Sequence, residues 1–224
     1  MKMLSLSSDR QLFDHPETGR LFRVSGFTLV EVLIAMSISL VVLTALYSAF
    51  TLQYKHINVQ EQVAEMQQSA RTAMDRLIKD IRMAGYNPTR ALTSPAIGIF
   101  NADSDSIQFT LDVTNAAGTG IPDGNTQDMN ENITFGIYTA GDIQRLGRKV
   151  TAGGNYQTMA EHVQSILFTY YDRNGNILTV PVSTPSEIRR IKVTLTLRTA
   201  KQDPGYGYRT FTLESFITPR NVGL

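Results

Sequence analysis

The feature that most restricts how this chain can fold is an uninterrupted apolar run near its N-terminus. Residues 27–50 read FTLVEVLIAMSISLVVLTALYSAF, 24 residues with one charged side chain, Glu31, and neither glycine nor proline. As an α-helix this run is about 36 Å long, enough to cross a hydrocarbon core of about 30 Å. Arg20 and Arg23 precede it, so the positive-inside rule places the N-terminus in the cytoplasm. We therefore expect one membrane-spanning segment followed by an exported domain.

The chain stays helical after residue 50 but becomes amphipathic. A secretory signal peptide is the competing interpretation of the apolar run, but its core would span about 7–15 residues and end at a small-residue cleavage site. Here the run continues into a second helical pattern, ended by Gly85 and Pro88. We expect one helix over residues 27–84, with Arg76 and Asp80 paired on its polar side. Its second half carries an apolar stripe at steps of three, four or seven: Val59, Val63, Met66, Ala70, Ala73, Leu77 and Ala84.

Beyond Pro88 the apolar residues alternate as in β-strands. The clearest case is RIKVTLTLR at 190–198, and Phe211 opens a last strand. Residues 164–171 are apolar on both faces, which favours a central strand joined by a hairpin to residues 177–182. Residues 112–131 are rich in Asn, Asp, Gly and Thr, which is typical of a long loop. The expected fold class is α+β: a long N-terminal helix, half transmembrane and half amphipathic, packed on an antiparallel β-sheet.

Composition excludes several classes of function. The chain has no cysteine, so it has no disulfide, thiolate metal site or thiol nucleophile. Residues 1–26, which precede the apolar run, hold four basic and three acidic side chains. The rest of the chain holds 17 basic and 17 acidic side chains. A net charge of zero gives no electrostatic case for nucleic acid binding. We expect no cofactor.

The residues at the start of the apolar run carry a recognisable motif. The stretch Ser25-Gly26-Phe27-Thr28-Leu29-Val30-Glu31 resembles the type IV prepilin processing motif. The resemblance implies a type IV pilin-like fold and cleavage by a prepilin peptidase between Gly26 and Phe27. It further implies N-methylation of Phe27 and a role for Glu31 as the charge that pairs with the neighbouring subunit's amine during assembly. A carboxylate at membrane depth is unfavourable by about 2.5–3.5 kcal/mol near a helix centre, so such pairing would relieve it. The simpler alternative is that Glu31 lies in the first helical turn and reaches the interface.

The resemblance implies a division of the chain. Residues 1–26 would be the cleaved leader and 27–50 the transmembrane and assembly helix. Residues 51–85 would cover the sheet, and 86–224 would form a periplasmic antiparallel β domain. The protein would lie in the inner membrane with one pass, and later in a pilus or pseudopilus.

Later segments are similar to PilW/PulJ-type minor pilins. They are IKDIRMAGYNP, AEHVQSILFTYYDRNGN and RRIKVTLTLRT. This implies a low-abundance subunit that helps to initiate or cap pilus assembly. Its partners would be the prepilin peptidase, other minor pilins, the major pilin and the inner-membrane assembly platform. A J-type pseudopilin of type II secretion is the alternative, and a pilin-anchored binding or DNA-uptake protein is a third.

Two other kinds of site have weaker signals. Oxygen-bearing side chains in the loop invite a calcium interpretation, but the EF-hand spacing is absent, and polar turn residues in a solvated loop explain them better. These residues are Asp123, Asn125, Gln127, Asp128, Asn130 and Glu131. We expect no catalytic residue, because His15, His56 and His162 stand apart and no GxSxG, HExxH or P-loop spacing occurs. Arg190, Lys192 and Arg198 are expected on the solvent face of a strand.

Overall fold

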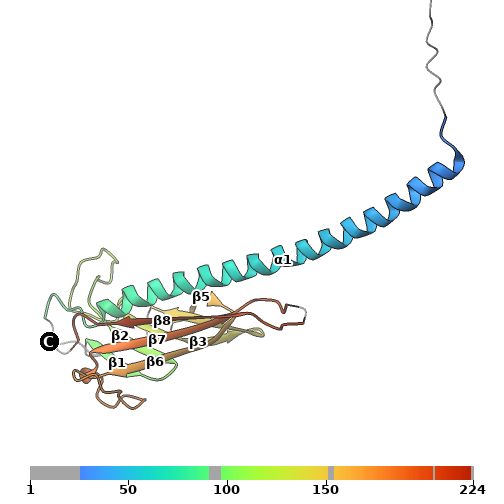
Figure 1. The fold of residues 1–224 in the computed structure, drawn as a ribbon. Coiled ribbons are helices and arrows are strands. Elements are labelled where there is room, and N and C mark those ends of the chain that lie inside the picture. The colour runs from blue at the N-terminus through green and yellow to red at the C-terminus, as the bar shows by residue number, and fades with distance from the viewer. Residues whose placement is uncertain (1–25, 91–96, 151–153, 204, 223–224) are drawn as a thin grey trace, which may run out of the picture. The chain divides into compact units, whose positions relative to one another are not determined.

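The computed structural model describes residues 26–90, 97–150, 154–203 and 205–222. The chain divides into two compact units, Met1–Leu52 and Gln53–Leu224. The predicted leader, apart from Gly26, lies outside the described residues. Helix α1 (Leu29–Met83, 55 residues) runs from the first unit into the second (Figure 1). The predicted helix is therefore confirmed to within two residues at each end.

Helix α1 ends where the sequence predicts, because Gly85 adopts a left-handed conformation that favours glycine. Its φ is +81°, and a Cβ atom there would lie 2.7 Å from the carbonyl oxygen of Asn221. The Gly85 amide donates to the carbonyl of Thr110, which ties the helix end to the first sheet.

In the described part of the chain, eight strands form two antiparallel sheets, each in sequential order. The five-stranded sheet contains β1 (Gly98–Ala102), β2 (Ser106–Thr110), β3 (Asn132–Ala140), β4 (Ile143–Lys149) and β5 (Gln157–Glu161). The three-stranded sheet contains β6 (Val163–Tyr171), β7 (Arg190–Arg198) and β8 (Thr210–Ile217). A short 3₁₀ helix, η1 (Pro185–Glu187), precedes β7. The fold class is α+β, as predicted, with the strands divided between two sheets.

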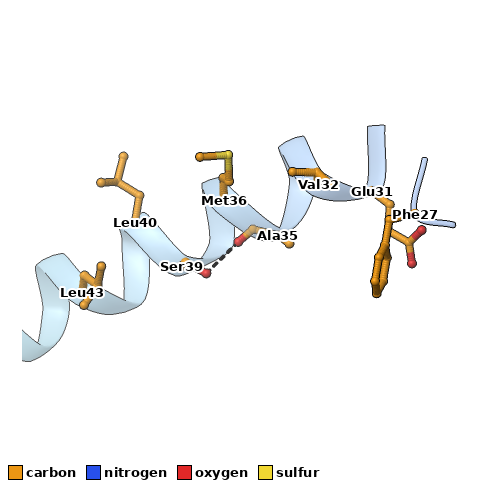
Figure 2. Close-up of a pocket in the computed structure, with 8 residues that line it drawn as sticks. All are labelled: Phe27, Glu31, Val32, Ala35, Met36, Ser39, Leu40 and Leu43. Atoms are coloured by element: carbon orange, nitrogen blue, oxygen red, sulfur yellow. Dashed lines mark hydrogen bonds between the residues drawn. The ribbon is translucent and has the colours of Figure 1, made fainter. Parts of the chain in front are cut away.

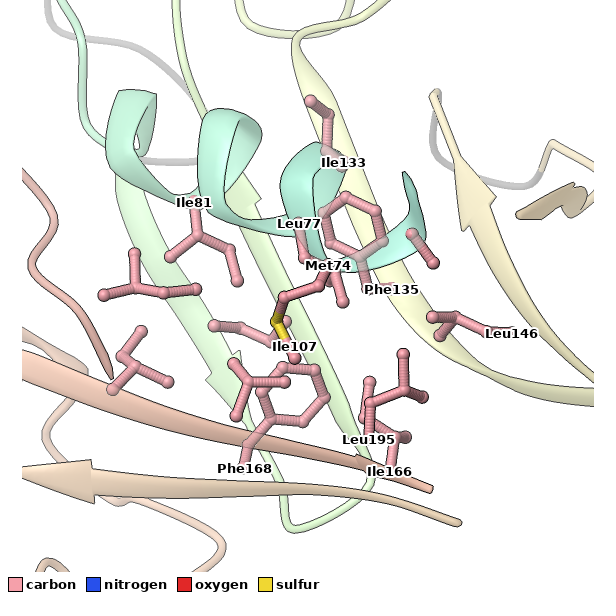
Figure 3. Close-up of a cluster of buried hydrophobic side chains, with 14 of the residues drawn as sticks. Met74, Leu77, Ile81, Ile107, Ile133, Phe135, Leu146, Ile166, Phe168 and Leu195 are labelled. Carbon is pink, nitrogen blue, oxygen red and sulfur yellow. The ribbon is translucent and has the colours of Figure 1, made fainter. Parts of the chain in front are cut away.

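The amphipathic part of α1 and both sheets contribute to one core. Met74, Leu77 and Ile81 of the helix lie against side chains from both sheets (Figure 3). The first sheet contributes Ile107, Ile133, Phe135 and Leu146, and the second Ile166, Phe168 and Leu195. The predicted stripe is buried from Met66 to Ala84, whereas Val59 and Val63 are half-buried. Burial of each large apolar side chain stabilises the domain by about 1.5–3 kcal/mol.

The structure corrects two expectations for the β6 region. Strand β6 is an edge strand of its sheet and not a central one, and its Leu167 is exposed. The turn at Asp172–Asn176 forms, but residues 177–182 form no strand: they contribute an isolated bridge, Tyr171 to Ile177, and the Leu178 amide donates to the Tyr170 carbonyl. The expected second strand of this hairpin is therefore wrong. In contrast, the predicted alternation of β7 is confirmed, with Ile191, Val193, Leu195 and Leu197 buried.

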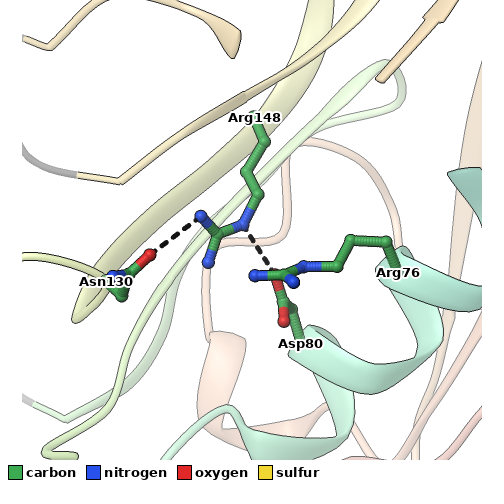
Figure 4. A network of polar contacts seen from close by, with 4 residues as sticks. All are labelled: Arg76, Asp80, Asn130 and Arg148. Atoms are coloured by element: carbon green, nitrogen blue, oxygen red, sulfur yellow. Dashed lines mark hydrogen bonds and ion pairs between the residues drawn. The ribbon is translucent and has the colours of Figure 1, made fainter. Parts of the chain in front are cut away.

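The helix is also joined to the first sheet by a buried ion pair that the sequence did not indicate. Asp80 was expected on the polar side of the helix, yet its side chain is buried beside Arg148 of β4. The Asp80 carboxylate accepts hydrogen bonds from Nε of Arg148 at 2.7 Å and Nε of Arg76 at 3.0 Å (Figure 4). Arg148 in turn donates to the side-chain oxygen of Asn130, at the end of the long loop.

Candidate functional site

The predicted cleavage position lies just outside the helix. Gly26, Phe27 and Thr28 are exposed and not helical, and α1 begins at Leu29. Phe27 is 81% exposed, and apart from its chain neighbours no described residue comes within 4 Å of a Cβ atom placed on Gly26. The Gly26–Phe27 peptide bond is therefore accessible to a protease that binds an extended chain.

Thr28 determines where α1 starts. Its Oγ1 accepts a hydrogen bond from the amide of Glu31 at 3.2 Å, and its carbonyl oxygen accepts the first helical bond, from the amide of Val32. Thr28 is thus the N-cap residue. This role of Thr28 was not predicted, although a threonine three residues before a glutamate at the start of an apolar run is the sequence signal for such a cap.

Glu31 lies exposed in the first turn of α1. It lines a shallow groove of about 600 Å³ on one side of the helix, together with Phe27 and apolar or small side chains (Figure 2). The other lining residues are Val32, Ala35, Met36, Ser39, Leu40 and Leu43. The groove brings the predicted assembly residue and the predicted new N-terminus to the same end of one apolar surface.

The apolar half of α1 is exposed all round. Large apolar side chains from Leu29 to Phe50 are between 46% and 77% exposed. Among the described residues, α1 is the one helix that is long and apolar enough to cross a membrane, judged by length and composition. Each hydroxyl at Ser37, Ser39, Thr44 and Ser48 donates to the carbonyl four residues earlier, so none is left without a partner. This arrangement suits a hydrocarbon environment, which cannot satisfy polar groups.

The loop considered for calcium is held together by its own carboxylates. Oε1 of Glu131 accepts from the amides of Val113 and Thr114, and Asp112 accepts from those of Asp123 and Gly124. The expectation of a solvated loop is wrong for Glu131, which is fully buried, whereas Asp123 and Asn125 are exposed.

Burial raises the pKa of Glu131 above its ordinary value, and the nearby Asp128 and Asp112 act in the same direction. In the described part of the chain, no group of three or more His, Cys, Asp or Glu side chains could hold a metal ion.

The described histidines and the basic strand residues do not form a catalytic cluster. His15 lies outside the described residues, His56 is exposed on α1, and His162 joins β5 to β6 with a φ of +56°. Arg190 lies over the rings of Tyr171 and Phe216, and Arg198 over that of Tyr208. Stacking on rings gives these arginines a structural role on the outer face of the second sheet.

Comparison with known proteins finds a family that matches the segment around the start of α1. Residues 21–47 match the family described as the prokaryotic N-terminal methylation motif. The chain is therefore type IV prepilin-like in this segment. Among solved structures, a type IV-like pilin from Thermus thermophilus is 13% identical, with a TM-score of 0.40. The match covers 70% of this chain and 97% of that pilin. No protein with a curated description matches.

Proposed function

We propose that this type IV prepilin-like chain is a minor type IV pilin, a structural subunit without enzymatic activity. Residues 1–26 form a leader that a prepilin peptidase removes, after which Phe27 is N-methylated. Residues 27–50 hold the subunit in the inner membrane and later in the filament. Residues 51–85 cover the sheets of a periplasmic domain that extends to residue 224. The observation that carries this proposal is the exposed, non-helical Gly26–Phe27 bond at the start of an apolar helix that matches the methylation motif.

Assembly would use the apolar surface of α1 and the charge of Glu31. Cleavage creates a cationic amine at Phe27, and a second subunit's Glu31 supplies the opposite charge. Two unpaired charges in a low-dielectric filament core are unfavourable, and pairing relieves both. Because the groove beside Glu31 is apolar, a neighbouring helix that fills it would exclude water from the pair. The partners of this process are the prepilin peptidase, other minor pilins, the major pilin and the assembly platform of the inner membrane.

Mass spectrometry of the protein from its native host tests the processing step. We expect the membrane-bound protein to begin at N-methyl-Phe27. Gly26→Val should accumulate as uncut precursor, because a branched side chain obstructs the approach to the scissile bond. Leu33→Ala, a change in the same helix away from that bond, should be processed normally. Membrane-bound protein that still carries residues 1–26 would refute the proposal.

The abundance of the protein in purified filaments tests whether it is a minor subunit. The described loop over residues 112–131 projects Ile121 and Met129 into solvent, and identical domains packed along a filament would have to accommodate it at every step. At a tip, the domain needs to fit only a few partners. We expect the protein to be scarce in sheared filaments, and its deletion to reduce the number of filaments without changing their bulk composition. Abundance near that of the dominant pilin, measured by quantitative proteomics, would instead indicate a bulk subunit.

A further inference from the structure

We infer that Thr28 is a positioning residue for the cleavage: its hydroxyl fixes the start of α1 and keeps the Gly26–Phe27 bond outside the helix. This inference rests on the proposed function, since it concerns how the precursor is presented to its peptidase. Hydrolysis requires water to attack the carbonyl carbon of Gly26. The bond to the Phe27 nitrogen then breaks, and that nitrogen takes up a proton as the new amine.

Two hydrogen bonds to Thr28 place the Gly26–Phe27 bond before the helix, with Thr28 between this bond and the first helical residue, Leu29. Oγ1 of Thr28 bonds the Glu31 amide at 3.2 Å, and the Thr28 carbonyl bonds the Val32 amide at 3.2 Å. Thr28 therefore takes the N-cap position, where the backbone leaves the helical conformation. Gly26 and Phe27 precede it and are not helical.

Without the cap, the helix has a competing start upstream. Ser25 is the next residue of a type that caps helices, three positions before Thr28. A helix that began at Ser25 would include Gly26 and Phe27 in its first turn. The carbonyl oxygen of Gly26 would then accept from the Val30 amide, four residues on. A protease would have to unwind this turn before it could bind the scissile bond in extended form.

Two substitutions at Thr28 separate the effect of its hydroxyl from the effect of its branched shape. Thr28→Val keeps the branched shape and removes the acceptor, whereas Thr28→Ser keeps the acceptor. Thr44 offers a matched control in the same apolar helix, because its hydroxyl bonds the Leu40 carbonyl at 2.8 Å and is remote from the cleavage position. Thr44→Val therefore removes one hydroxyl and leaves the helix start unchanged.

The test uses the full-length precursor in detergent micelles with purified prepilin peptidase, and compares cleavage rates at low substrate concentration. We expect Thr28→Val to lower kcat/KM about fivefold, the factor that corresponds to a typical N-cap loss of about 1 kcal/mol. Thr28→Ser and Thr44→Val should match the wild type. Hydrogen exchange in the uncut precursors should show slower exchange at the amides of Leu29 and Val30 in Thr28→Val than in the other three proteins, because an upstream start gives these amides helical partners four residues earlier.

The outcomes separate this inference from the proposed function. If the wild-type precursor is not cut at all, both are overturned. If the wild type is cut and Thr28→Val is cut equally fast, the proposed function stands and the inference is wrong. A slow Thr28→Val precursor whose amides exchange as in the wild type would also overturn it, because the peptidase would then be reading the hydroxyl directly.

Discussion

Asp80 of α1 and Arg148 of β4 form a buried ion pair, with Oδ2 and Nε 2.7 Å apart. Both side chains are at least nine-tenths buried, and the two residues are 68 positions apart in the chain. Since Arg148 also bonds Asn130, the pair joins the helix, the five-stranded sheet and the long loop.

Removal of one member of this pair should destabilise the domain far more than removal of both. Asp80→Leu leaves the buried Arg148 without a carboxylate, which costs about 3–5 kcal/mol. Arg148→Met should cost less, because Asp80 still pairs with Arg76. The double variant should recover most of that loss in urea unfolding followed by circular dichroism. As a control, Glu214→Gln breaks the exposed pair with Lys192 and should cost less than about 1 kcal/mol. A double variant as unstable as the sum of the two single variants would contradict this account.

Glu131 should make the stability of the domain depend on pH. Its folded-state pKa is raised above the ordinary value of 4.5, mainly by burial, so the folded state binds its proton more tightly than the unfolded state. The stability that Glu131 gains from this tighter proton binding is therefore fully present below pH 4.5 and is lost as the pH rises through the folded-state pKa. Glu131→Gln keeps an oxygen for the amides of Val113 and Thr114 and removes the charge.

The free energy of unfolding of Glu131→Gln should fall less than that of the wild type between pH 4.5 and pH 8. Glu131→Ala removes the acceptor and should cost about 1–3 kcal/mol at pH 4.5 and less at higher pH, where the wild type has lost the contribution of the protonated group. Identical pH profiles for Glu131→Gln and the wild type would show that Glu131 titrates alike in both states.

Glu31 should be needed for assembly and not for insertion or processing. Glu31→Ala leaves the Gly26–Phe27 bond and the Thr28 hydroxyl in place, so we expect it to be inserted and cut as in the wild type. Its crosslinking to other pilins should fall sharply, because the amine of Phe27 loses its proposed partner. Glu31→Gln, which keeps the size of the side chain, should show the same loss. Wild-type crosslinking in both variants would favour a carboxylate that only reaches the membrane interface.

The covering part of α1 should be essential for the folding of the sheets. A fragment that starts at Gln53 keeps every helix residue that enters the core, from Met66 to Ala84. We expect it to be soluble and to unfold cooperatively. A fragment that starts at Tyr86 exposes the apolar face opposite the helix, including Ile107 and Phe135, and should aggregate. Equal cooperativity of the two fragments in thermal unfolding would show that the sheets form a core without the helix.

The sequence by itself determined the elements whose signals are local. The C-terminal end of α1 follows from an unbroken helical pattern that stops before Gly85, and the inward face of β7 follows from strict alternation between Ile191 and Leu197. The motif around Gly26 and Phe27 is equally local, and the matched family covers it. In each case neighbouring residues in the chain carry the whole pattern.

Only the tertiary structure decided which polar groups meet. Asp80 fits the exposed side of an amphipathic helix by spacing, and Glu131 fits a solvated turn, yet both are buried. Their partners lie on other segments, Arg148 on β4 for Asp80 and the amides of Val113 and Thr114 for Glu131. The edge position of β6 was likewise set by the order in which strands pair. Periodicity reports whether a face is apolar, but a buried charge is tolerated only where a distant group supplies its hydrogen bonds, and that group is chosen by the fold.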